Sequence, residues 1–282
     1  MSHERKVWIN GKPDSEVSVL DRGFQYGDGL FETIAVVDGQ CEFLLQHLDR
    51  LQRSCARLGF PALFLEQVTQ EIVSFVGDES RAVLKLLLTR GQGGRGYGVP
   101  APSCVECTRV LLLYPWPDYP SSHWRDGVRI RFCTTPVSSN SALAGMKHLN
   151  RLDSVLARSE WQGTDFAEGL LLDGQSIVEG TMTNLFAVRN GMLYTPALEC
   201  SGVRGIMRQQ ILAWAALSGI DILETAIHPD WLLQADELFL SNSIIGLWPV
   251  RQLNSTFWPV GKITKALMRH LNLQSRGVVL DD

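Results

Sequence analysis

The sequence predicts an α+β fold that is divided into two domains. The chain has 282 residues, of which 45% are hydrophobic, so it can bury a full core and form two modest domains. Strand and helix patterns follow one another without the strict alternation that a doubly wound parallel sheet requires. A stretch rich in proline and serine separates the two halves. We therefore expect a smaller N-terminal α/β domain over residues 1–114, a linker over 115–125 and a larger C-terminal domain over 126–282.

The first half should form a small sheet that is covered by a helix. Asn-Gly at 10–11 and Asp-Gly at 38–39 follow apolar runs, which predicts two hairpin turns. Apolar residues then recur at steps of three and four over 44–58, the pattern of an amphipathic helix, and a glycine and a proline close it. The apolar runs 83–89 and 109–114 are expected to be neighbouring buried strands on either side of a glycine-rich loop.

The second half begins after the linker, whose prolines and serines are too frequent for a regular helix or strand. Its periodicity and turn signals predict mixed strands and helices. These are a strand at 128–133, a helix at 150–161, hairpin turns at 173–174 and 190–191, a strand at 176–179, a helix opening near Gly202 and a strand at 237–240.

Composition excludes several classes of partner. The formal net charge of −4 gives no basic excess for nucleic acid, and no apolar run approaches the ~20 residues that span a bilayer. The first residues contain no apolar signal core, and six scattered cysteines fit a reducing compartment, so we expect a cytoplasmic enzyme. Cys104 and Cys107 form a CxxC pair, but no second pair or HxxxH completes a metal site, and we expect none.

The glycine-rich loop satisfies the dinucleotide fingerprint GxGxxG at Gly91, Gly93 and Gly96. The fingerprint also needs a helix whose N-terminus faces the pyrophosphate, and the prolines that follow prevent one from starting soon enough. Two alternatives remain. The loop either contacts a small substrate, with Arg95 and Tyr97 as its polar tips, or is an ordinary surface turn.

Two titratable residues occupy suggestive positions. Lys147 has small and apolar neighbours, and such a setting would lower the pKa of its amine, as a Schiff-base or proton-transfer lysine requires. Glu179 ends a predicted strand, where its carboxylate could face a cofactor. Taken alone, a lysine is usually solvated and a glutamate more often caps a helix or lies on the surface.

An anion site is also indicated. Residues 201–205 are rich in glycine and lead into a helix, and free backbone N–H groups at the positive end of a helix dipole suit a phosphate. The alternative is a turn that glycine permits. Arg50 flanks the apolar stripe of its helix, where it could pair with a phosphate or extend to water. A lysine, a carboxylate, an anion site and an arginine together meet the needs of one cofactor.

These residues lie in motifs that resemble the fold-type IV pyridoxal-phosphate enzymes, which include branched-chain aminotransferases, D-amino-acid aminotransferases and aminodeoxychorismate lyases. The similarity spans nearly the whole chain and runs through residues 21–29, 31–33, 47–51, 144–150, 179–180 and 201–204. It implies a two-domain architecture like that of D-amino-acid aminotransferase, a C-terminal domain that binds pyridoxal 5'-phosphate, a small-molecule substrate and a homodimer. The glycine-rich loop could then serve the partner's site.

The resemblance also implies roles for particular residues. Lys147 would carry the cofactor covalently and act in catalysis, Glu179 would pair with the pyridine nitrogen, and Arg50 would bind the phosphate. The rest of the phosphate site would consist of the backbone amides of Val203 and Arg204 with Asn242 and Ser243. The substrate would contact Arg95, Tyr97, Phe31 and Tyr26.

Residues 90–97 and 147–152 resemble the lyase branch in detail. D-amino-acid aminotransferases place an arginine, a histidine and a tyrosine where this chain has Arg95, Tyr97 and Phe31, and branched-chain enzymes have a tyrosine in place of Leu152. The resemblance therefore implies elimination of pyruvate from 4-amino-4-deoxychorismate to give 4-aminobenzoate for folate biosynthesis. The alternatives are a transaminase of the same fold and, from another class, a non-catalytic phosphate-binding or scaffold protein.

Overall fold

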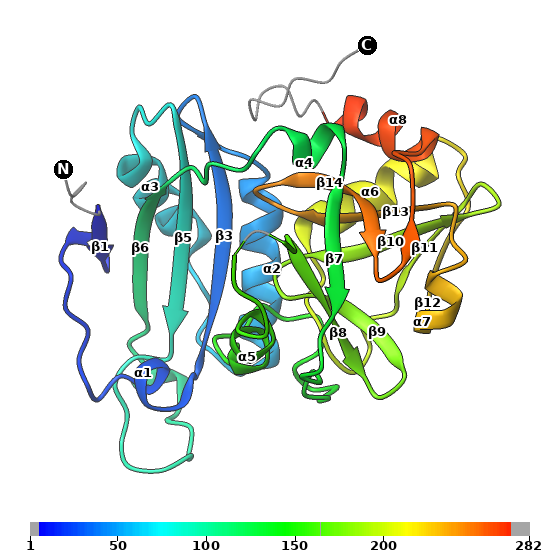
Figure 1. Cartoon of the computed structure of the whole chain (residues 1–282). Helices are drawn as coiled ribbons and strands as arrows, with labels where there is room; N and C mark the ends of the chain where they lie inside the picture. The colour runs from blue at the N-terminus through cyan, green and yellow to red at the C-terminus, as the bar shows by residue number, and fades with distance from the viewer. Residues whose placement is uncertain (1–5, 164, 272–282) are drawn as a thin grey trace. The chain divides into compact units, whose positions relative to one another are not determined.

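The structure is a computed structural model that describes residues 6–163 and 165–271 (Figure 1). The chain divides into two compact units. The first unit comprises Met1–Pro117 and Met146–Asn150, and the second comprises Asp118–Gly145 and Arg151–Asp282. The main boundary thus falls inside the segment predicted as a linker. The return of five residues to the first unit was not predicted.

The first unit is built on a six-stranded antiparallel sheet with the order β2-β1-β6-β5-β3-β4. The strands are β1 (Val7–Ile9), β2 (Lys12–Pro13), β3 (Gly29–Val37), β4 (Gln40–Cys41), β5 (Arg81–Thr89) and β6 (Thr108–Pro115). Both predicted hairpins are confirmed, and Asn10 and Asp38 adopt the positive φ of 49° that their turns require. The predicted pairing of β5 with β6 is confirmed as well.

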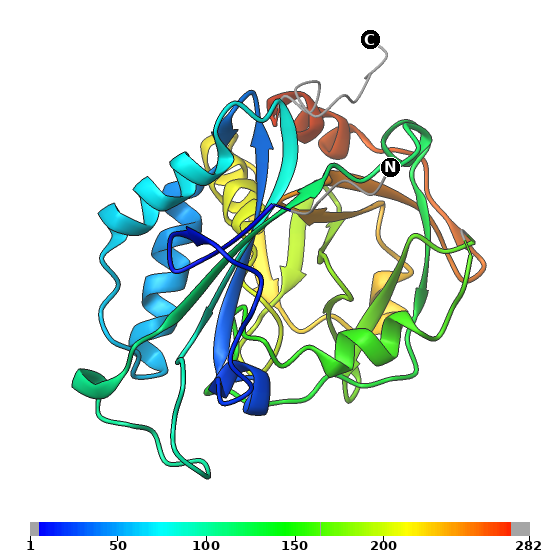
Figure 2. The same cartoon turned by 90° about the vertical axis from the view of Figure 1, so that its left-hand side faces the viewer.

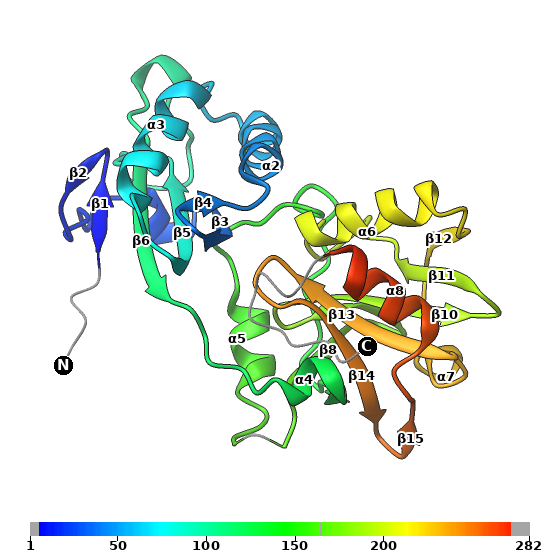
Figure 3. The same ribbon diagram turned by 90° about the horizontal axis from the view of Figure 1, so that it is seen from above.

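Three α-helices accompany this sheet: α1 (Arg22–Tyr26), α2 (Leu44–Arg57) and α3 (Leu65–Val76). The helices α2 and α3 lie on one face of the sheet (Figure 3), and α2 confirms the predicted amphipathic helix. Since side chains alternate along a strand, β3 turns Leu30, Glu32 and Ile34 toward α2 and Phe31 and Thr33 toward the opposite face. The loop between β5 and β6 extends away from the sheet (Figures 1 and 2) and contains only a short 3-10 turn at Pro102–Cys104, so no helix follows the GxGxxG pattern.

The returning segment Met146–Asn150 adds to β3. The amide of Phe31 donates to the carbonyl of Lys147 at 2.9 Å, and the amide of Leu149 donates to the carbonyl of Gly29 at 3.0 Å. The Asn150 side chain continues the contact by donating to the carbonyl of Gly27 at 3.2 Å. Asn150 therefore cannot start the helix predicted over 150–161, and helix α5 spans only Leu152–Arg158.

The second unit contains a nine-stranded mixed sheet with the order β12-β11-β10-β13-β14-β7-β8-β9 and β15 beside β14. Its strands are β7 (Val128–Phe132), β8 (Glu168–Asp173), β9 (Ser176–Gly180), β10 (Asn184–Arg189), β11 (Met192–Pro196), β12 (Ile222–Thr225), β13 (Glu237–Asn242), β14 (Gly246–Leu253) and β15 (Thr256–Phe257). The remaining helices are α4 (Ser122–Arg125), α6 (Ile206–Leu217), α7 (Pro229–Leu232) and α8 (Lys262–His270). The strands and hairpins predicted for this half are confirmed with shifts of one or two residues.

One expectation for this unit was wrong. Helix α4 forms inside the predicted linker, because Trp124 is buried and its indole N–H donates to the carbonyl of Ile245 at 2.9 Å. The helix expected to open near Gly202 is confirmed as α6, which begins at Ile206 directly after the glycine-rich residues 201–205. The α+β class is confirmed, and within the described ranges no helix is long and apolar enough to cross a membrane.

Candidate active site

Lys147 lies beside the aromatic ring of Phe31 in the first unit. Its ammonium nitrogen is 4.3 Å from the ring centroid, within the range of a cation–π contact. Its backbone is fixed by the bond from the Phe31 amide, and its neighbour Met146 is buried. Two of the predicted site residues are therefore in contact.

A second lysine approaches the same ring and was missed by the sequence analysis. Lys85 pairs with Thr33 across the sheet, on the face that carries Phe31, and its nitrogen is 5.3 Å from the ring centroid. Within residues 6–163 and 165–271 it has neither a hydrogen bond nor an ion pair. The sequence did contain a signal for this lysine, because it is a charged residue in the middle of an apolar strand. Side chains alternate along a strand, so Lys85 points to the face opposite that of its neighbours Leu84 and Leu86.

Arg50 is buried and pairs with Glu32, a partner that was not predicted, and its pairing with a phosphate stays a prediction. Its Nε donates to Glu32 Oε1 at 2.9 Å, and its Nη2 donates to Oε2. His47 Nδ1 lies 2.6 Å from the same Oε2. Burial raises the pKa of Glu32, but the Arg50 charge and the His47 hydrogen bond outweigh it, and the pKa falls to about 2. Glu32 thus remains ionised and holds Arg50 in place.

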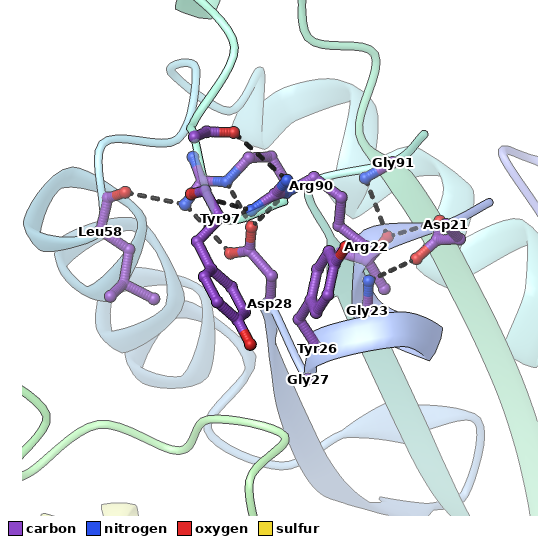
Figure 4. A network of polar contacts seen from close by, with 12 residues as sticks. Asp21, Arg22, Gly23, Tyr26, Gly27, Asp28, Leu58, Arg90, Gly91 and Tyr97 are labelled. Carbon is purple, nitrogen blue, oxygen red and sulfur yellow. Dashed lines mark hydrogen bonds and ion pairs between the residues drawn. The ribbon is translucent and has the colours of Figure 1, made fainter. Parts of the chain in front are cut away.

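The glycine-rich loop brings together two of the predicted substrate residues, Tyr26 and Tyr97 (Figure 4). Their rings meet edge to face with centroids 5.4 Å apart, and the Tyr26 hydroxyl accepts a hydrogen bond from the Gly96 amide at 3.3 Å. Tyr97 is 84% exposed. Arg95 is also exposed, and its side chain makes no hydrogen bond or ion pair to the residues that the structure describes. Its charge is therefore available to a ligand.

Glu179 is the buried end of β9 in the second unit. Its carboxylate accepts the backbone N–H of Val203 at 2.8 Å. Gly202 adopts a φ of +80°, and an added Cβ would lie only 2.7 Å from Leu198, so this approach requires glycine. Burial lowers the pKa of Arg151, and the charge of Glu179 acts in the opposite direction, which identifies a cationic neighbour that the sequence analysis missed.

The two backbone amides predicted for a phosphate have protein acceptors in this structure. The Val203 amide donates to Glu179, and the Arg204 amide donates to the carbonyl of Gly145 at 3.1 Å. Gly145 stands two residues before Lys147 in the chain, and its own amide donates to Gly202 at 2.9 Å. These bonds fix the backbone of Gly145 within the second unit.

The start of α6 retains unfilled hydrogen-bonding capacity. Its N-cap, Gly205, has no side chain to cap the helix, and the Asn184 side chain donates to the carbonyl of Val203 at 2.9 Å. Ser241 pairs with Asn184 across the sheet, and its buried hydroxyl has no hydrogen-bond partner among the described residues. A helix N-terminus beside an unsatisfied hydroxyl suits an anion.

Asn242 makes hydrogen bonds within the protein. Its side-chain oxygen accepts the amides of Ile244 at 2.8 Å and Ile245 at 2.9 Å, and its nitrogen donates to Met182 at 3.2 Å. The side chain therefore shapes the turn that follows β13 and contains Ser243. Ser241, which was not predicted, is the member of this triplet with an orphaned hydroxyl.

Comparison with known proteins identifies the family. The profile of the amino-transferase class IV family matches residues 29–253. An aminodeoxychorismate lyase of Vibrio harveyi is 36% identical over 94% of this chain and 99% of its own length. A crystal structure of 4-amino-4-deoxychorismate lyase from Pseudomonas aeruginosa superposes with a TM-score of 0.90 at 44% identity, covering 94% of this chain and 97% of the other. A protein described as a putative branched-chain-amino-acid aminotransferase of Methanocaldococcus jannaschii is 32% identical over 93% of both chains.

These matches cover most of the chain, and they agree with the motifs around residues 21–33 and Lys147 from which the resemblance was first inferred. The fold is that of the fold-type IV aminotransferase-like structures. The chain belongs to the class IV aminotransferase family.

Proposed function

We propose that this chain is a 4-amino-4-deoxychorismate lyase that uses pyridoxal 5'-phosphate. The observation that carries the proposal is the 44% identity, over 94% of the chain, to a lyase of that name in Pseudomonas aeruginosa. The contact of Lys147 with Phe31 supports it, because it places the predicted cofactor lysine beside a predicted substrate residue. The reaction releases pyruvate and leaves 4-aminobenzoate, a folate precursor.

The residues of this structure fit the cofactor. Lys147 would hold it covalently, and the carboxylate of Glu179 would keep the pyridine nitrogen protonated. The orphaned hydroxyl of Ser241 and the uncapped start of α6 support a phosphate there. The resemblance also implies Arg50, Val203, Arg204, Asn242 and Ser243 for the phosphate, although Arg50 and the amides of Val203 and Arg204 have protein acceptors in this structure. When bound, the cofactor supplies an electron sink for the bond-breaking steps.

The protein's own residues would then move one proton and position the substrate. The amine of Lys147 takes the proton from C4 of the substrate ring. The C3–O bond breaks with its electron pair on the oxygen, and the released enolpyruvate takes up one proton at its methylene carbon to become pyruvate. The remaining ring becomes aromatic, which favours the forward reaction. Because the substrate carries two carboxylates, the exposed cation of Arg95 is a suitable donor, and the resemblance implies Tyr97, Phe31 and Tyr26 as further substrate contacts. Lys85, which contacts the Phe31 ring, is a second cation that has no ion pair with the described residues.

Product analysis tests this proposal. Purified protein is incubated with pyridoxal 5'-phosphate and aminodeoxychorismate, and 4-aminobenzoate and pyruvate are expected in equal amounts. Lys147→Ala should abolish turnover and the visible absorbance of the lysine-bound cofactor, whereas Lys265→Ala, an exposed lysine on α8, should retain both. Borohydride reduction followed by peptide mapping should place the adduct on Lys147. An adduct on another lysine, or none, would remove Lys147 from this role.

A transaminase activity is the second candidate, because the Methanocaldococcus relative is described as a putative branched-chain-amino-acid aminotransferase. Supplying D-alanine or a branched-chain amino acid without aminodeoxychorismate distinguishes the two. A transaminase would convert the cofactor to its pyridoxamine form and release a 2-oxo acid. We expect the lyase reaction to be the faster one by at least tenfold, a difference of about 1.4 kcal/mol in the barrier.

We also propose that the enzyme acts on its small substrate as a cytoplasmic homodimer. Support for the dimer comes from the first unit, where Val17, Val19, Leu20 and Phe24 are large apolar side chains exposed within eight residues of chain. Exposed apolar side chains so close in sequence are unfavourable in water, and a second copy of the chain could cover them.

A further inference from the structure

A single buried arginine holds the apex of the glycine-rich loop (Figure 4). Arg22, the first residue of α1, is 4% exposed. Its guanidinium donates to the carbonyls of Gly96 at 3.1 Å, Gly98 at 3.3 Å and Tyr97 at 3.5 Å. Its Nε donates to Asp28 at 2.8 Å. Three consecutive loop carbonyls therefore converge on one side chain.

Asp28 lies between that arginine and a second one. Arg90, at the start of the loop, donates from Nε to Asp28 Oδ2 at 2.8 Å and from Nη2 to Oδ1 at 3.1 Å. It also donates to the carbonyls of Leu58 at 2.9 Å and Gly59 at 3.1 Å, just after α2. Burial raises the pKa of Asp28, but the hydrogen bonds and charges of Arg90 and Arg22 outweigh it, so the pKa is lowered and the carboxylate stays charged.

Hydrogen bonds also connect helix α1 and its N-cap to both ends of the loop. The Arg22 amide donates to the carbonyl of Gly91 at 2.8 Å. Asp21 caps the helix at the Gly23 amide at 2.7 Å, and its other oxygen accepts the hydroxyls of Thr89 and Thr108 at 2.8 Å each. Because these threonines end β5 and begin β6, the base of the loop cannot move independently of Arg22.

The glycines of the loop are fitted to this arrangement. A Cβ on Gly93 would lie 2.7 Å from Cδ of Arg22, so any larger residue there must displace the arginine. Gly91 has a φ of +76°, and its added Cβ would lie 1.9 Å from the carbonyl oxygen of Glu106. Gly91 and Gly93 of the GxGxxG pattern are therefore explained by packing within the loop, because a side chain at either position would collide with Glu106 or Arg22.

We propose that Arg22 is a positioning residue, held by Asp28 and Arg90, that fixes the loop geometry in which Arg95 and Tyr97 meet the substrate. Arg22 bonds the carbonyls on both sides of Tyr97, and its guanidinium carbon lies 5.2 Å from the ring centroid of Tyr26, which in turn contacts Tyr97. The proposal rests on the proposed function, since that function gives Arg95 and Tyr97 their substrate.

A double-mutant cycle tests whether Arg22 acts through Arg95. Arg22→Gln and Arg95→Gln are each expected to lower kcat/KM by about tenfold or more, chiefly through KM, because positioning of the substrate carboxylate is lost. The variant with both changes should lose little more than Arg95→Gln alone. The matched control is Arg109→Gln, which removes an arginine paired with Glu71 in the same unit and should leave KM unchanged.

Amide hydrogen exchange tests the same proposal without relying on activity. In Arg22→Gln, the Gly96 amide, which donates to the Tyr26 hydroxyl, should exchange faster while the amides of β5 and the cofactor absorbance stay unchanged. Gly93→Ala is the second variant, because it displaces the arginine without removing its charge and should reproduce both effects if Arg22→Gln does not fold.

Unchanged exchange in the loop, or losses in kcat/KM that simply multiply in the double variant, would overturn the positioning role. Failure of the wild-type chain to form 4-aminobenzoate is a separate result. It would reject the proposed function, while the exchange measurement would still decide whether Arg22 orders the loop.

Discussion

Glu32 is a carboxylate enclosed in the first unit between His47 and Arg50. Removing one partner of a buried ion pair leaves the other charge uncompensated, so Glu32→Gln should lower the free energy of unfolding by about 3 kcal/mol at pH 7. Denaturant unfolding measures this loss. Glu79→Gln, at an exposed position of the same unit, is the control and should change little.

The same carboxylate predicts a pH dependence with a definite sign. Its pKa is about 2 in the folded chain against an ordinary value of 4.5, so its stabilisation is complete above pH 4.5 and is lost as the pH falls toward 2. Unfolding measured at several pH values across this window should show the loss in the wild type and a shallower dependence in Glu32→Gln. Parallel curves for the two proteins would show that Glu32 does not titrate as described.

Lys85 should contribute to substrate affinity. Its ammonium contacts the Phe31 ring and has no carboxylate partner among the described residues, so its charge is free to meet a substrate carboxylate. A charge-assisted hydrogen bond is worth about 1.5–3 kcal/mol, and Lys85→Met should therefore raise KM by about tenfold or more. Steady-state kinetics with aminodeoxychorismate check this. Lys12→Met, an exposed lysine on β2, should behave as the wild type.

Some functional residues could be predicted from the sequence, and others could not. Lys147 and Glu179 were identified because motifs surround them, and the family assignment that rests on those motifs is confirmed. Glu32 was not given a role, since its partners His47 and Arg50 come from a helix 15 and 18 residues later and local patterns do not show which face meets them. The acceptors of the Val203 and Arg204 amides were unpredictable for the same reason.

At the scale of elements, helix α8 is capped by a side chain from a distant strand. Glu237 of β13 accepts the amides of Ile263 at 3.1 Å and Thr264 at 2.8 Å and the Thr264 hydroxyl at 2.7 Å. The N-cap itself is Gly261, which has no side chain to offer. Glu237→Ala should therefore destabilise the second unit by about 2 kcal/mol and speed exchange of the first amides of α8. Glu199→Ala, at an exposed position, is the control, and equal exchange in both would contradict the cap.

Elements defined by local chemistry were predicted well, whereas those that depend on distant partners were not. The Asn190-Gly191 hairpin and helix α2 follow from turn residues and periodicity, which lie entirely within the segment. Helix α5 was predicted too long because Asn150 bonds to Gly27, 123 residues earlier. Helix α4 was missed because its support is a bond from Trp124 to Ile245, 121 residues later.

At the scale of the whole molecule, the moderate charge and balanced composition agree with a folded α+β chain. The resemblance to the fold-type IV enzymes was expected to span nearly the whole chain, and the two lyase matches cover 94% of it. Composition and motifs report on the fold because they average over many residues. They do not report on assembly, which depends on a few exposed side chains.

Assembly gives the last prediction. Phe24 is 75% exposed on α1, next to Leu20, and an aromatic ring on such a surface gains about 2 kcal/mol when a second copy covers it. Sedimentation of the wild type should give twice the chain mass, and Phe24→Asp should shift it toward one chain by placing a charge in the contact. Phe64→Asp, at 79% exposure before α3, should remain a dimer. A monomeric wild type, or the same shift in both variants, would show that the Val17–Phe24 segment is not where two copies meet.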